Sequence, residues 1–107
     1  MTNPKVSEEE NNRRMFCNNL DEPSSRWLLE HLTPEPPQVF VEPVRRPEPV
    51  GQPMTYVVLE RDQAIPPGLQ RAMARDAGIT DLPSLDAGHD VMLSQPAALA
   101  ALVAHYA

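Results

Sequence analysis

The fold of this chain is decided by residues 54–96, MTYVVLERDQAIPPGLQRAMARDAGITDLPSLDAGHDVMLSQP. The stretch begins with a continuous apolar run over 54–59, which is too short for a helix and predicts a strand buried on both faces. Pro66 and Pro67 then open a helix that stops at Gly78, where glycine tolerates the left-handed conformation. A second short strand is expected over 81–85, so the order is strand, helix, strand.

The predicted helices each carry one apolar stripe. In the helix between the two strands the stripe consists of Leu69, Ala72, Met73 and Ala77. Ser94 is expected to cap a last helix, in which the apolar positions i, i+3, i+4 and i+7 are Leu99, Leu102, Val103 and Tyr106. The fold class is therefore α/β, with two parallel strands and the order strand, helix, strand, helix.

Asp62 and His89 each follow one of the two predicted strands. A crossover of this length is nearly always parallel and right-handed, so both strands end at the same edge of the sheet. Asp62 comes three residues after Leu59 and His89 four after Leu85, and adjacent strands lie about 4.8 Å apart. We expect the carboxylate to reach the imidazole and fix its tautomer, so that the other ring nitrogen takes a proton from a serine. The alternative is that Asp62 is only a turn residue and His89 only a loop residue.

Two motifs surround these residues, VVLERDQAIPPGLQ at Asp62 and LDAGHDVMLSQP at His89. Together they resemble the carboxyl-terminal part of the α/β-hydrolase superfamily, in the branch of plant methyl-ester esterases, hydroxynitrile lyases and their bacterial relatives. In VVLERDQAIPPGLQ, the match places the catalytic acid at Asp62, followed by the AIP-type turn and a glutamine at Ala64, Ile65, Pro66 and Gln70. In LDAGHDVMLSQP, the histidine motif matches Gly88, His89, Met92 and Leu93. A weaker resemblance of residues 15–37 to the end of the cap segment extends the similarity over residues 13–107.

This resemblance implies a partial α/β-hydrolase fold in three parts: a disordered tail over 1–12, a cap-like helix and Pro-rich connector over 13–53, and the carboxyl-terminal hydrolase segment over 54–107. It also implies Asp62 and His89 as catalytic residues acting on a small carboxylic ester, without a cofactor. The lyases of the branch place a lysine directly after the histidine, whereas this chain has Asp90. That difference favours an esterase-like ancestry.

The nucleophile of such a triad is missing from these 107 residues. In the family it lies in G-x-S-x-G between a strand and a helix, and no serine here lies between two of the four glycines at that spacing. Ser24 and Ser25 fall at a helix start, Ser84 in a strand and Ser94 at a cap. Cys17 could attack an ester, but nothing in the sequence lowers its pKa or places it beside His89.

The amino-terminal half is polar and then rich in proline. Residues 1–12 contain a glutamate run and one aliphatic residue, which predicts disorder. A helix over 21–32 is expected to begin with Asp21 as its cap, and its apolar face includes Trp27, either as a core residue or as part of a substrate pocket together with Met92. Seven prolines over 34–53 predict a stiff connector without helix or central strand.

Composition limits the partners of the chain. The net charge is −6 with 13 prolines and one cysteine, which argues against a nucleic-acid ligand and against an internal disulfide. The amino terminus has no apolar run, so no membrane association is expected and the cytoplasm is the default location. A metal site built from the three histidines and Cys17 has no supporting ligand spacing.

Two functions remain open from the sequence. The first is the acid-and-histidine portion of an esterase, inactive alone and acting on an ester once the missing part completes it. The second is a non-catalytic interaction protein or remnant that binds a partner chain, or itself, through the exposed sheet edge and the Trp27 face.

Overall fold

The computed structural model describes residues 7–45 and 51–107. At its centre is a parallel pair of strands, β1 (Val58–Leu59) and β2 (Ser84–Leu85), in the register Val58↔Ser84 and Leu59↔Leu85. An isolated bridge between Thr55 and Asp81 extends the pairing toward the amino-terminal ends. The parallel arrangement of the two strands is confirmed, but regular pairing is shorter than the predicted 54–59 and 81–85. Pro83 lies between the bridge and the strand, and it has no N–H to donate.

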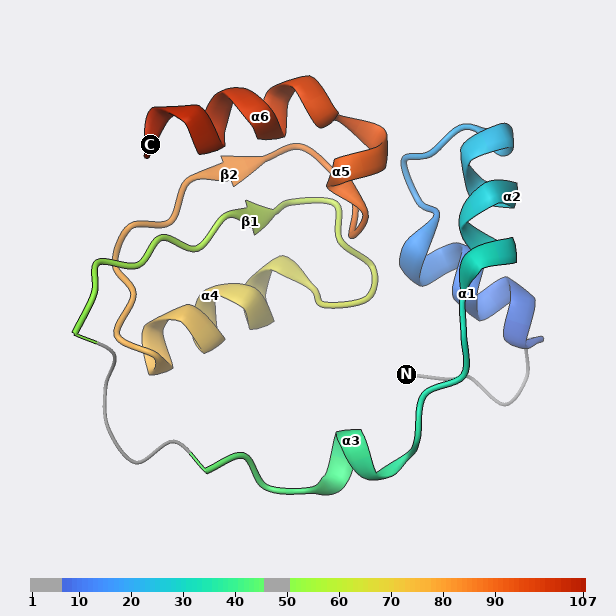
Figure 1. The fold of residues 1–107 in the computed structure, drawn as a ribbon, viewed down its shortest axis with the longest axis horizontal. Helices are drawn as coiled ribbons and strands as arrows, with labels where there is room; N and C mark the ends of the chain where they lie inside the picture. The colour runs from blue at the N-terminus through green and yellow to red at the C-terminus, as the bar shows by residue number, and fades with distance from the viewer. Residues whose placement is uncertain (1–6, 46–50) are drawn as a thin grey trace.

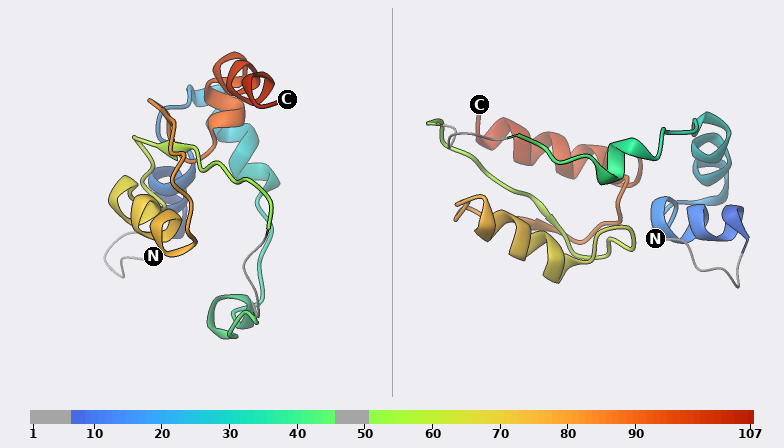
Figure 2. Two further views of the ribbon diagram at one scale, coloured as in Figure 1. Left: turned by 90° about the vertical axis from the view of Figure 1, so that its left-hand side faces the viewer. Right: turned by 90° about the horizontal axis from the view of Figure 1, so that it is seen from below.

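Helices lie on both sides of this pair of strands. Figure 1 shows the strands between α4 (Pro67–Asp76) and α6 (Pro96–His105), which follows the four-residue α5 (Val91–Ser94). Gly78 ends the α4 region with φ of +77°, as expected for a left-handed stop. Both strands point with their carboxyl ends toward α1 and α2, so the loops that follow the strands meet the amino-terminal helices (Figures 1 and 2).

The first helix corrects the prediction of a disordered tail over 1–12. α1 spans Glu8–Phe16, while residues 1–6 lie outside the described part of the chain. Ser7 caps the helix by accepting a hydrogen bond from the Glu10 amide at 3.1 Å. Glutamates occupy its first turn and arginines its last, an order that suits the helix dipole. The charged composition thus favours a capped helix, and the buried Asn11 shows that this helix packs against the protein.

The next helix agrees with its prediction, and the connector after it does not. α2 spans Glu22–His31, and the Asp21 side chain accepts from the Ser24 amide at 2.8 Å. The connector contains a one-turn helix, α3 (Gln38–Val41), where no helix was expected. This segment lies between Pro37 and Pro43 and is long enough for one turn without a proline inside it. Residues 46–50 of the predicted connector lie outside the described part.

Three details of the predicted packing are wrong. α4 faces the sheet with Gln70 and Ala74, whereas Leu69 and Met73 of the predicted stripe are 51 % and 44 % exposed. Ser94 is the last residue of α5 and caps nothing, because Pro96 begins α6 directly after Gln95. Val58 is fully buried but Met54 is exposed, so only the end of the predicted strand is covered on both faces.

Substituting Gln70→Ala should lower the free energy of unfolding by about 1–3 kcal/mol, because it leaves buried backbone groups of β1 without partners. Urea unfolding followed by circular dichroism measures the change, with the exposed Gln52→Ala as the matched control. Equal stability of the two variants would show that the Gln70 amide does not hold the strand.

Candidate active site

Asp62 lies in the turn that follows β1 and is 4 % exposed. Its Oδ1 accepts hydrogen bonds from the backbone amides of Ala64 at 2.7 Å and Ile65 at 2.9 Å. An aspartate that binds amides two and three residues ahead stabilises this kind of tight turn. The residues that follow Asp62 therefore hold its carboxylate in a fixed orientation.

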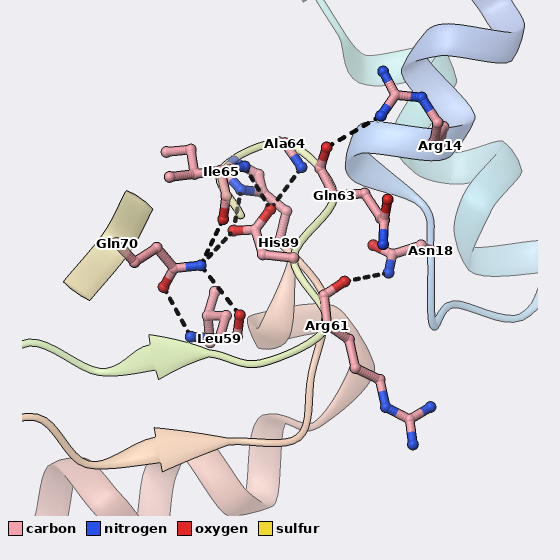
Figure 3. A network of polar contacts seen from close by, with 10 residues as sticks. Arg14, Asn18, Leu59, Arg61, Gln63, Ala64, Ile65, Gln70 and His89 are labelled. Atoms are coloured by element: carbon pink, nitrogen blue, oxygen red, sulfur yellow. Dashed lines mark hydrogen bonds and ion pairs between the residues drawn. The ribbon is translucent and has the colours of Figure 1, made fainter. Parts of the chain in front are cut away.

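Gln70 ties the acid turn to the strand. From α4, its Oε1 accepts from the Leu59 amide at 2.9 Å, and its Nε2 lies 3.1 Å from the Leu59 carbonyl and 2.7 Å from the Ile65 carbonyl (Figure 3). The same nitrogen lies 3.4 Å from Asp62 Oδ2. One buried amide thus fixes the end of β1, the turn and the second carboxylate oxygen.

His89 follows β2 and meets Asp62 at this edge of the sheet. Its Nδ1 lies 2.9 Å from Asp62 Oδ2, and the imidazole is 31 % exposed while the carboxylate is buried. A carboxylate at Nδ1 favours the tautomer with the proton on Nδ1, which leaves the lone pair on Nε2. The expectation that topology brings the two side chains together is met. Their catalytic role stays a prediction.

The comparisons with known proteins give a family but no individual relative. A model of the alpha/beta hydrolase family matches residues 4–102. The chain belongs to the α/β-hydrolase family. No curated protein and no solved structure matches. Within the α/β-hydrolase family an acid hydrogen-bonded to a histidine after a strand has the arrangement of the last two members of a triad.

The last residue of α1 and the turn that follows it also approach the pair in this hydrolase chain, and the sequence analysis missed them. The Phe16 ring centroid lies 5.4 Å from that of His89, and the Asn18 amide donates to the Arg61 carbonyl. Residues 7–12 fall in the predicted tail, although Ser7 followed by three glutamates is a helix-start signal that could have indicated α1.

A second acidic side chain, Asp90, lies next to His89 in the sequence. Burial raises the pKa of Asp90, the residue after the histidine, although the neighbouring His89 partly opposes the shift. Asp90 Oδ2 is buried without a hydrogen-bond partner among the residues that the structure describes. In this α/β-hydrolase the position after the histidine thus holds an acidic side chain and no lysine.

The predicted pocket residues Trp27 and Met92 do not line the same hollow. Trp27 lines a cavity of about 230 Å³ with Pro23, Ser24 and Leu93, and its ring stacks on His31. Met92 lines a separate groove of about 410 Å³ along α6. In the described ranges, 7–45 and 51–107, no group of three metal-ligating side chains converges and no helix is long and apolar enough to cross a membrane.

Replacing Asp62 by asparagine should remove the tautomer preference of His89, because a neutral amide no longer stabilises a proton on Nδ1. Nitrogen-15 NMR of the imidazole measures this as convergence of the two ring-nitrogen shifts. Asp76→Asn at the exposed end of α4 is the control. An unchanged His89 spectrum in Asp62→Asn would contradict the pairing in solution.

Cys17 should react slowly with iodoacetamide. Burial raises the pKa of its thiol, so less thiolate is present at neutral pH. We expect alkylation in the folded chain at pH 7.5 to be at least about tenfold slower than in urea. Equal rates in the two states would contradict this and would reopen Cys17 as a nucleophile.

Proposed function

We propose that this chain carries the acid and the general base of an esterase-type α/β-hydrolase. Asp62 is the acid, His89 is the base, and the nucleophilic serine comes from outside these 107 residues. The observation that carries the proposal is the 2.9 Å hydrogen bond between the buried Asp62 carboxylate and Nδ1 of a partly exposed imidazole. Burial of the acid and exposure of the base are what proton transfer from an external hydroxyl requires.

In the proposed reaction, His89 Nε2 takes the proton of the serine hydroxyl as that oxygen attacks the ester carbonyl. Asp62 stabilises the resulting imidazolium without taking a proton. The imidazolium then gives its proton to the leaving alcohol. The neutral imidazole next activates a water molecule, which attacks the acyl-serine ester and releases the carboxylic acid product. Two backbone amides and the Gln70 amide keep Asp62 in place throughout these steps.

The serines of the chain do not fit the nucleophile's role. Ser25 is buried, and Ser94 Oγ is buried at the end of α5. Ser24 lies in the first turn of α2 and lines the cavity beside Trp27. None follows a strand in a G-x-S-x-G sequence.

The substrate class that we propose is a small carboxylic ester. The carboxylate of Asp90 beside His89 supports ester hydrolysis over cyanohydrin cleavage, because a cation next to the base is absent from that position. The cavity at Trp27, with Leu93 shortly after the histidine loop, is the proposed place for an apolar part of the substrate.

A second candidate is a non-catalytic interaction protein. It is favoured by the exposed apolar side chains of the carboxyl-terminal region, among them Met92, Val103 and Tyr106, and by the half-exposed Trp27. His89→Ala separates the two proposals. A binding protein keeps its partner affinity in this variant, whereas a hydrolase loses turnover and keeps its assembly.

A fluorophosphonate probe, which attaches to an activated serine, tests the proposed esterase function. The native protein that contains this sequence, isolated from its source, should be labelled, and His89→Ala should reduce the labelling rate by at least about a hundredfold. His105→Ala, at the end of α6, is the control. An unchanged labelling rate in His89→Ala would overturn the assignment of His89 as the base.

A further inference from the structure

The carboxyl end of α1 touches the loop that carries the acid. Asn18 Nδ2 donates to the carbonyl of Arg61, the residue before Asp62, and Arg14 donates to the carbonyl of Gln63, the residue after it, at 3.3 Å (Figure 3). Two contacts therefore flank the acid, one from α1 and one from the turn after it, and both come from residues more than forty positions earlier in the chain.

The same asparagine lies against the loop that carries the histidine. A Cβ on Gly88, the residue before His89, would lie 2.5 Å from the Asn18 carbonyl oxygen and 2.6 Å from its Oδ1. Only a residue without a side chain permits this approach. The two loops are joined directly as well, because the Arg61 amide donates to the Ala87 carbonyl at 3.0 Å. Asn18 thus contacts the residue that precedes each member of the pair.

Phe16, the last residue of α1, contacts the imidazole itself. The two ring centroids are 5.4 Å apart and the rings are inclined by 55°. A single hydrogen bond at Nδ1 leaves the imidazole able to pivot about that bond, which would move Nε2. A second contact on the ring, from an aromatic side chain, restricts that rotation.

We propose that Asn18 and Phe16 are positioning residues for the proposed general base. Asn18 sets the spacing between the acid loop and the histidine loop, and Phe16 sets the direction in which His89 Nε2 points. Both residues act through the position of His89. The catalytic meaning of this inference rests on the proposed function, but the geometry itself is measurable without a substrate.

Nitrogen-15 NMR of His89 in the 107-residue chain provides the test, with His31→Gln and His105→Gln used to assign the signals. Asn18→Asp keeps the size of the side chain and removes the donor, and Gly88→Ala forces Asn18 away. Both should bring the two ring-nitrogen shifts together and remove the deshielded Nδ1 proton. Phe16→Leu should broaden that proton through faster exchange with water, and Phe16→Tyr should restore it.

Asn12→Ala on α1 and the exposed Phe40→Leu are the matched controls and should leave the spectrum unchanged. A native His89 spectrum in both Asn18→Asp and Gly88→Ala would overturn the inference. Unfolding of both variants, seen by circular dichroism, would also overturn it, because the contact between Asn18 and Gly88 would then support the whole fold. If the unsubstituted chain lacks the Nδ1 proton signal, the Asp62–His89 pair fails, and with it the proposed function.

Discussion

Asp62 holds a carboxylate almost out of contact with water, and a buried charge is stable only when donors surround it. Its oxygens accept from two amides of its own turn, from Gln70 on α4 and from His89 after β2. The turn, the crossover helix and the second strand must therefore all be in place before this group is satisfied. Removing one partner is costly because the charge stays buried.

Around this polar centre the apolar core is small. Its fully buried members are short side chains together with Val58, while large apolar residues of α4 and α6 remain exposed. A two-stranded parallel sheet of this kind normally has further strands and covering helices on both faces. Such neighbours would cover the exposed apolar side chains of Leu69 and Met73 on α4 and of Val103 on α6. The chain therefore has the geometry of a site supported by hydrogen bonds more than by packing.

The meeting of Asp62 and His89 could be predicted because a right-handed crossover leaves little choice for the ends of two parallel strands. The orientation of α4 could not be predicted in this way. Its apolar stripe points away from the sheet, since Gln70 satisfies the backbone of β1 from the opposite face. A periodicity argument counts apolar residues and gives no weight to one buried amide that makes several hydrogen bonds.

The contacts of Phe16 and Asn18 were also beyond the reach of the sequence. They join the end of α1 and the turn after it to loops more than forty residues away, and such docking depends on tertiary packing that local patterns do not encode. The short α3 differs from the prediction for a simpler reason: the proline content of 34–53 argues against a helix, but the interval between Pro37 and Pro43 is long enough for one turn. Local rules thus predicted the pair and its strands, and long-range packing decided the surroundings.

The native mass of the protein in its source, followed with peptides from residues 54–107, tests the central claim most directly. The account predicts a species heavier than the 11.9 kDa of this chain, containing a G-x-S-x-G serine on the same or an associated polypeptide. A native species composed only of this 11.9 kDa chain would contradict it, because Asp62 and His89 would then have no serine to activate.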